Sequence, residues 1–269
     1  MAARPVHRAI QHLRTVRRLV ASGRRERADR QLAFTLSFVA GGLNAGAFLL
    51  VRQYTSHMTG IVSALADNLA SGALRLAALC IAALASFIAG AAISAISINW
   101  SRRRGSRAPY AAPLLFEACL LVLFGALGAF VSPSPRAVTA AIPFLCFLMG
   151  LQNATITKVS GSRMRTTHMT GIVTDIGIEL GKLLYWNRMP SHVVVLADRK
   201  KLDLLSKLLF CFITGGIVGA WTFALLGTAA ALPVATLLAA VATAPALEAQ
   251  LVLREAKRRR CRRLDPRPP

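Results

Sequence analysis

Long apolar runs separated by short polar segments are the main pattern along this chain. A helix needs about 20 apolar residues to cross the hydrocarbon core of a bilayer. Six runs reach or approach that length, at about residues 32–51, 76–99, 109–131, 137–157, 205–227 and 228–249. The second is the clearest, because Leu76 to Ile98 carries no charge, and the sixth is the weakest, because Pro233 and Pro245 interrupt it. The pattern predicts an all-α polytopic membrane protein with six transmembrane helices.

The basic residues are concentrated between these runs. The chain has 33 Lys and Arg against 11 Asp and Glu, a net charge of +22. Nearly all of the basic residues fall in four blocks, at 1–30, 102–107, 158–201 and 254–267. Cytoplasmic loops collect Lys and Arg, and six spans with both termini inside place every block on that side. We therefore expect a multi-pass protein of the cell (inner) membrane, with a cytoplasmic N-terminus and C-terminus.

This charge pattern divides the chain into a basic arm over residues 1–31, a transmembrane domain over 32–249 and a basic tail over 250–269. The arm and the tail suit the anionic lipid of a bilayer surface. A net charge of this size can also indicate nucleic acid. Because the basic blocks separate spans too apolar for a soluble nucleic-acid-binding domain, we expect the lipid bilayer as partner and no nucleic acid.

The sequence His-Met-Thr-Gly-Ile-Val occurs twice, at residues 57–62 and 168–173. Each copy follows an apolar run that carries Asn-Ala, at Asn44 in the first case and Asn153 in the second. We interpret this as a duplication, with repeat one over residues 32–131 and repeat two over 137–249. Because three spans is an odd number, the second repeat enters the membrane from the opposite side. The prediction is a 3+3 inverted repeat, a plan common among transporters.

Each motif begins a segment that is short for a transmembrane helix, from Gly60 to Ser71 and from Gly171 to about Trp186. Such segments suit re-entrant half-helices, for which Thr59 and Thr170 are placed as N-caps. A helix that starts inside a membrane presents unpaired N–H groups, which attract anions or polar solutes. We therefore predict one polar substrate site where the repeats meet. Its residues are Asn44, His57, Thr59, Gly60, Asn153, His168, Thr170 and Gly171.

Two alternatives to this site stay open. Thr-Gly at a helix start can simply cap a tight turn, and a duplication preserves architecture as readily as function. The second helix also carries Asp175, Glu179 and Lys182 on one face. That face suits an amphipathic helix at the cytoplasmic surface as well as a re-entrant one.

Glu117 lies within the third apolar run. A carboxylate at that depth costs on the order of 3 kcal/mol on insertion scales, and such residues are candidates for function. We expect Glu117 to carry a proton or to meet a cationic partner. Otherwise it lies near enough to the inner face to reach water, or is simply protonated.

Small residues at four-residue spacing indicate close helix packing. They include Gly90 and Ser94 in the second run and Gly215 and Gly219 in the fifth. In lipid, such stripes let helix backbones approach. The partner helix could belong to the same chain or to a second copy, so the sequence leaves a homo-oligomer open.

The chain lacks the common signatures of catalysis. No G-x-S-x-G, H-E-x-x-H or G-x-x-x-x-G-K-[ST] motif occurs. The five cysteines form no C-x-x-C pair, and four of them lie in apolar runs. We expect no enzyme activity, no cofactor and no metal site.

The paired motifs resemble a known family. Gly41-Gly42-Leu43-Asn44-Ala45 followed by Ser-His-Met-Thr-Gly, then Gly-Leu-Gln-Asn-Ala and a second Thr-Gly, are similar to the YoaK-like family of bacterial integral membrane proteins. The resemblance covers roughly residues 32–249. It implies membrane location and several spanning helices, and no reaction, because the family is a domain of unknown function. The chain departs from the family pattern at Asn44, where Asp is usual, and at Ile61, where Asn is usual.

These features together favour a small-solute or anion transporter or channel. The alternative is a membrane structural or interaction protein that transports nothing. A membrane-embedded hydrolase using one of the motif histidines is the least favoured hypothesis.

Overall fold

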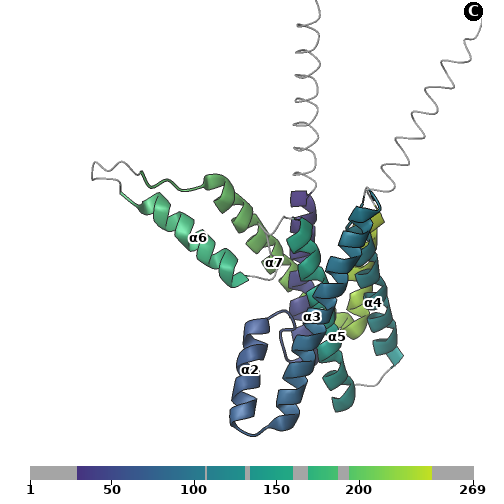
Figure 1. Cartoon of the computed structure of the whole chain (residues 1–269). Helices are drawn as coiled ribbons and strands as arrows, with labels where there is room; N and C mark the ends of the chain where they lie inside the picture. The colour runs from purple at the N-terminus through teal and green to yellow at the C-terminus, as the bar shows by residue number, and fades with distance from the viewer. Residues whose placement is uncertain (1–28, 107, 131–133, 160–168, 187–193, 244–269) are drawn as a thin grey trace, which may run out of the picture.

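The computed structural model of the chain describes residues 29–106, 108–130, 134–159, 169–186 and 194–243, and these residues are helical with no strand (Figure 1). The first span is described over Asp29–Val51. The labelled helices are α2 (Met58–Ala70), α3 (Leu74–Arg103), α4 (Ala111–Phe130), α5 (Pro135–Val159), α6 (Met169–Leu184) and α7 (Arg199–Leu226). A 3-10 turn, η1 (Gly227–Ala230), leads into a last helix described over residues 231–243.

Five helical stretches in the described residues are long and apolar enough to cross a membrane. They are Asp29–Val51, Leu74–Arg103, Ala111–Gly128, Ala137–Lys158 and Arg199–Thr243. These helices agree with the multi-pass membrane protein that the sequence predicts. The count of six stays a prediction, because it requires the fifth stretch to cross twice.

That fifth stretch does bend. Gly227, with φ of 56°, ends α7, and a glycine tolerates this left-handed backbone without strain. The last helix then packs beside α4, with Thr228 against Gly128 and Leu232 against Gly125. The described part of the last helix runs only to residue 243.

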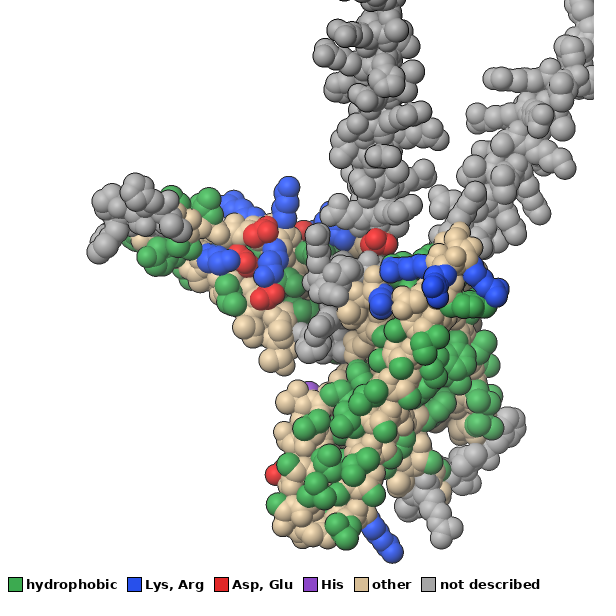
Figure 2. All heavy atoms as spheres, in the orientation of Figure 1, with side chains coloured by type: hydrophobic (Ala, Val, Ile, Leu, Met, Phe, Trp, Pro, Cys, Tyr) green, Lys and Arg blue, Asp and Glu red, His purple; other side chains and the backbone are tan. Residues whose placement is uncertain are grey.

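The outer faces of the long helices are apolar. Exposed side chains on α3 include Ile88 and Ile96, and those on α7 include Phe210, Ile217 and Trp221. Figure 2 shows this apolar surface along α3. An apolar exposed face is what contact with lipid requires.

Close backbone contact joins the helices in two parallel pairs. The first span packs on α7, where a methyl group added at Gly41 would collide with the carbonyl oxygen of Phe212. A methyl group at Gly215 would likewise collide with the carbonyl oxygen of Phe38. The partner of this small-residue stripe therefore lies in the same chain.

The second pair repeats this arrangement between α3 and α5. A methyl group at Gly90 would collide with the carbonyl oxygen of Phe147, and one at Gly150 with that of Phe87. Ser94 and Thr155 add a hydrogen bond of 2.9 Å between their hydroxyl groups across the same pair.

A polar clasp closes one end of the bundle. The Arg102 guanidinium donates to the Tyr110 hydroxyl at 2.7 Å, and that hydroxyl donates to the Lys158 carbonyl at 3.2 Å. The clasp joins the ends of α3 and α5 to the start of α4. Figure 2 shows basic side chains gathered at this end, and in Figure 1 the first span begins and the last helix ends toward it.

The two short helices run in opposite directions. In Figure 1, α2 runs from mid-height toward the end opposite the clasp, whereas α6 runs outward and toward the clasp end. With 13 and 16 residues, neither is long enough to cross a bilayer. Within the described part of the chain, α2 packs on α3, α6 packs on α7, and the two short helices share no packed interface.

Candidate functional site

The loop between the first span and α2 folds back on the bundle. The first span ends where the Arg52 N–H donates to the Phe48 carbonyl at 2.8 Å. Arg52 has φ of 57°, a left-handed conformation that costs a residue with a Cβ on the order of 1 kcal/mol. Four residues later, Ser56 returns to the level of Asn44. The Asn44 Oδ1 accepts from the Ser56 N–H at 3.2 Å and from its hydroxyl at 2.9 Å.

Helix α2 begins at Met58, two residues before the Gly60 start that the first motif predicts. His57 occupies the N-cap position and makes no capping hydrogen bond through its side chain. The prediction that Thr59 caps this helix is wrong, because the helix begins at Met58 and Thr59 already lies in its first turn. The His57 ring instead folds over Gly60, where its Nδ1 lies 2.7 Å from the position that a Cβ would occupy.

A cavity of about 390 Å³ lies beside this helix start, and we name it the polar cavity because polar side chains interrupt its mostly apolar lining. The first span, the loop, α2 and the beginning of α3 all contribute to it, and its polar lining residues are Arg52, Gln53, Tyr54, His57 and Asn68. It therefore combines one guanidinium, one imidazole, two amides and a phenol next to the N-terminal end of a helix. This arrangement can hold an anion or a small polar solute. The sequence prediction missed Arg52, Gln53, Tyr54 and Asn68, although the unusual placement of Arg52 after an apolar run was visible.

The structure places the second motif less completely. His168 lies outside the described residues. Because α6 begins at Met169, Thr170 lies in the first turn and is not the N-cap that we expected. Thr170 and Gly171 are exposed, and a Cβ at Gly171 would meet nothing within 4 Å. Asn153 lies partly buried on α5.

The predicted site thus divides into two groups. The structure brings Asn44, His57 and Gly60 together beside the polar cavity, with Thr59 exposed on the first turn of α2. Asn153, Thr170 and Gly171 belong to the other half of the chain. A single site shared by both groups stays a prediction.

Charged groups join α6 to the beginning of α7. The Glu179 carboxylate accepts from the Asp198 backbone N–H at 2.8 Å and from the Lys182 ammonium at 3.0 Å. The Asp198 N–H, then the Lys182 hydrogen bond and the charges of Lys182 and Lys201, lower the pKa of Glu179. Asp198 caps α7 by accepting from the N–H groups of Lys200 and Lys201. The polar face of α6 is therefore used against α7 and does not line the predicted site.

Two buried polar side chains lie elsewhere, inside the bundle. Glu117 on α4 is 0% exposed and Gln152 on α5 is 1% exposed. Within the described residues, neither carboxyl oxygen of Glu117 and neither amide atom of Gln152 has a hydrogen-bond partner. The expectation that Glu117 reaches water near the inner face is wrong. Gln152 stands directly before Asn153 in the repeated region, and the sequence prediction passed over it.

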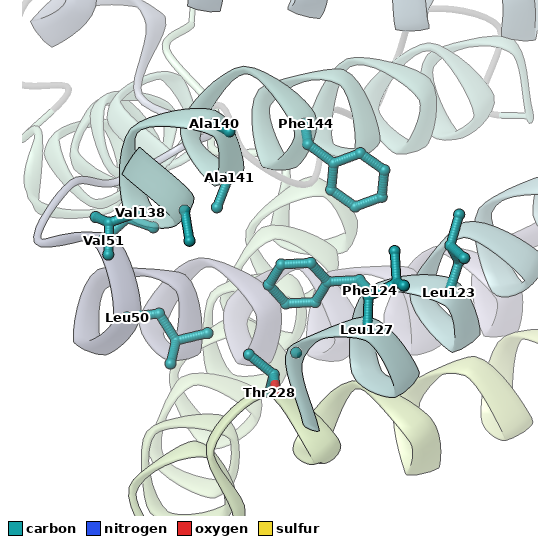
Figure 3. Close-up of a pocket in the computed structure, with 12 residues that line it drawn as sticks. Leu50, Val51, Leu123, Phe124, Leu127, Val138, Ala140, Ala141, Phe144 and Thr228 are labelled. Carbon is teal, nitrogen blue, oxygen red and sulfur yellow. The ribbon is translucent and has the colours of Figure 1, made fainter. Parts of the chain in front are cut away.

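An apolar pocket of about 450 Å³ opens at the end opposite the clasp. Figure 3 shows the rings of Phe124 and Phe144 projecting into it, and these rings stack with centroids 5.7 Å apart. Thr228 supplies the one hydroxyl among its lining residues. With no charged side chain in its lining, this pocket does not suit an anion.

Comparison with known proteins gives a family and little else. The sequence model of a family described as a protein of unknown function (DUF1275) matches residues 32–244. The chain belongs to the DUF1275 family. No curated protein and no solved structure matches it. Membership agrees with the expected domain of unknown function over nearly the same residues, and the YoaK-like name remains a resemblance.

Within this DUF1275 chain, the departure at Asn44 has a simple physical explanation. Asn44 uses only its Oδ1 to hold Ser56, as an acceptor from two donors. An Asp carboxylate accepts hydrogen bonds in the same way, so either residue fixes the loop before α2. The other departure, Ile61, is 2% exposed and packs in the hydrophobic core between α2 and its neighbours.

Proposed function

We propose that this DUF1275 protein is a small-solute or anion transporter or channel of the cell (inner) membrane. The observation that carries the proposal is the polar cavity at the start of α2, which holds Arg52 and His57 beside a helix N-terminus. Arg52 and His57 are both exposed at this cavity, so a solute that enters it can meet a guanidinium and an imidazole. The left-handed backbone at Arg52 carries a conformational cost at the same place.

The proposal includes a 3+3 inverted repeat. Its support is the pair of matched helix crossings described above. Aligning Asn44 with Asn153 places Gly41 on Gly150 and Phe38 on Phe147. Gly41 meets the Phe212 carbonyl of α7, and Gly150 meets the Phe87 carbonyl of α3. In return, the Phe38 carbonyl meets Gly215 of α7, and the Phe147 carbonyl meets Gly90 of α3. In Figure 1 the first span and α5 run in opposite directions, as an inverted pair would.

In this proposal the two repeats share a substrate path, with Asn44, His57, Thr59 and Gly60 in one half and Asn153, His168, Thr170 and Gly171 in the other. Both termini face the cytoplasm, because the basic clasp end lies on the side that the positive-inside rule makes cytoplasmic. The bilayer, and anionic lipid at the basic termini, are the proposed partners, and no catalytic step is assigned.

One observation favours the alternative of a non-transporting structural or interaction protein. Thr59 and Thr170 are both exposed, and Gly171 has open space around it. Surface turns of this kind would serve architecture alone. Measured flux decides between the two hypotheses.

The test is anion flux in proteoliposomes that contain the purified full-length chain, with chloride, nitrate, formate and phosphate as probes. We expect at least one probe to cross faster than in empty vesicles, and Arg52→Gln to reduce that rate about tenfold or more. Arg75→Gln is the matched control, because Arg75 is exposed at the start of α3 and lies outside the cavity. No flux with any probe, or equal losses in both variants, would contradict the proposal.

A further inference from the structure

Glu117 and Gln152 lie at the same level of two neighbouring antiparallel helices. The Tyr110–Lys158 hydrogen bond fixes one end of the α4–α5 register and the stacked rings of Phe124 and Phe144 fix the other. Glu117 lies seven residues beyond Tyr110, which is about 10 Å along α4, and Gln152 lies six residues before Lys158, which is about 9 Å along α5. From the stacked rings, Glu117 lies about 10 Å from the level of Phe124, and Gln152 lies about 12 Å from the level of Phe144.

Long side chains at one level can reach each other across packed helices, whose axes are about 8–10 Å apart. Both side chains are fully withdrawn from the surface, so both point into the bundle interior. Their four polar atoms are without partners in the described residues. Leaving such atoms unpaired in an apolar medium costs several kcal/mol. Some ligand or partner therefore has to satisfy them.

Within the described residues, no charged side chain is placed to form an ion pair with Glu117. On the first span, α3, α5 and the last helix, the described charged side chains lie at the helix ends: Asp29, Arg30, Arg75, Arg102, Arg103 and Lys158. The other titratable groups on the elements around it are the thiols of Cys80, Cys119 and Cys146 and the phenol of Tyr110, which are ordinarily neutral at pH 7.

We propose that Glu117 binds a proton and, in that state, pairs with Gln152. The acid O–H donates to the Gln152 Oε1, and the Gln152 Nε2–H donates to the other Glu117 oxygen. A carboxylic acid and a primary amide are complementary in this way, because each presents one donor beside one acceptor. All four unpaired atoms are then satisfied.

A metal cation satisfies the same atoms less well. Hard cations such as Ca²⁺ take about six or more oxygen ligands. The pair offers three side-chain oxygens, and the Gln152 Nε2–H groups would still lack an acceptor. No group of three or more metal-ligating side chains occurs in the described part of the chain. The proton is therefore the ion that fits.

The proton site adds a coupling ion to the proposed transporter, and this link rests on the proposed function. The pair itself does not, because it can be detected in protein that transports nothing. When the proton leaves, the carboxylate faces the amide oxygen and one hydrogen bond is lost. Release therefore loosens α4 from α5 at this level.

Infrared difference spectroscopy on the purified full-length protein in lipid tests the pair. At pH 7 we expect the carbonyl band of a protonated carboxylic acid, which disappears in Glu117→Gln and moves to higher frequency in Gln152→Leu. Glu179→Gln is the matched control and should leave the band unchanged, since Glu179 is held outside the spans by Asp198 and Lys182. Circular dichroism checks that each variant keeps its helix content.

Three outcomes would overturn the pair. One is a wild-type spectrum at pH 7 without the band, which would mean an ionised Glu117. Another is a band that Gln152→Leu leaves unmoved. The third is loss of the band when sodium replaces potassium at constant ionic strength, which would make the ligand a metal cation. Anion flux in proteoliposomes can fail while the band remains, so the two proposals fail separately.

Discussion

At the scale of single residues, a few side-chain hydrogen bonds join parts of the chain where helices bend or meet. Asn44 holds the loop before α2, Ser94 meets Thr155, and Glu179 holds the start of α7. Each contact joins residues far apart in the sequence or at opposite ends of a loop. Sequence analysis identified Asn44 as a site residue and included Ser56 in the family motif, but nothing in the sequence indicated that the two side chains meet.

We predict that Glu179→Gln weakens the α6–α7 junction at neutral pH. The folded-state pKa of Glu179 lies below its ordinary value of about 4.3. Its contribution to stability is therefore fully present above that value and is lost as the pH falls through the lower, folded-state pKa. Thermal unfolding at pH 7 should show a lower Tm for the variant, and the difference should disappear at acidic pH.

The control for this prediction is Asp203→Asn. Asp203 pairs with Lys207 at 2.7 Å, but both side chains are more than half exposed. Such pairs contribute little to stability. Equal effects of the two substitutions at neutral pH would show that the buried position of Glu179 has no special importance.

At the scale of the helices, the sequence predicted the spans well and the interactions between them poorly. The length of the apolar runs located the first span, α3, α4, α5 and α7, because lipid contact imposes a composition on each helix separately. The short helices were also expected from the repeated motif. Their first turns were misplaced by two residues, because the capping signal of Thr59 and Thr170 depends on a backbone conformation that the motif does not determine.

The α4–α5 register could not be predicted either. Glu117 stood out as a charge in an apolar run, whereas Gln152 was one of several polar residues near the end of its run. Only the packing of the two helices places them at one level. Likewise, the polar cavity depends on the fold of the loop over residues 52–57, which no periodic pattern describes.

We predict that Gly41→Ala and Gly150→Ala each destabilise the protein by about 1–3 kcal/mol, as overpacking does in a close-packed interior. At both positions a Cβ would meet a backbone carbonyl of the facing helix, so the helices must move apart. Thermal unfolding in detergent or lipid measures the effect. The two losses should be similar, because the two crossings are alike.

The matched control is Gly177→Ala on α6, where a Cβ would meet nothing within 4 Å. Helix propensity alone should then raise stability by up to about 1 kcal/mol. A Tm for Gly41→Ala as high as that for Gly177→Ala would show that the crossing tolerates a methyl group.

At the scale of the whole molecule, charge is distributed along one axis. The basic side chains of the clasp end gather at one end of the bundle, and the turn between α2 and α3 lies toward the other (Figure 1 and Figure 2). In the proposed topology, the positive-inside rule places the clasp end in the cytoplasm. This assignment is independent of whether the chain crosses five or six times at its C-terminal end.

We predict that Ser106→Cys is labelled only from the cytoplasmic side and Ser71→Cys only from outside, in a variant whose five native cysteines are replaced. Both positions are exposed in turns, Ser106 after α3 and Ser71 after α2. The measurement is reaction with a membrane-impermeant maleimide before and after permeabilisation. The reverse pattern would invert the molecule and remove the cytoplasmic assignment of the termini.

In both close helix pairs, a helix of the first half of the chain packs on a helix of the second half. This pairing has a consequence for synthesis of the chain. In the described residues, Gly41 and Gly42 of the first span meet the backbone of α7, more than 150 residues later. Until a ribosome has completed that region, these glycines have no α7 backbone to pack against. Assembly therefore cannot proceed half by half, and a nascent chain stopped after α5 should be a substrate for membrane proteases.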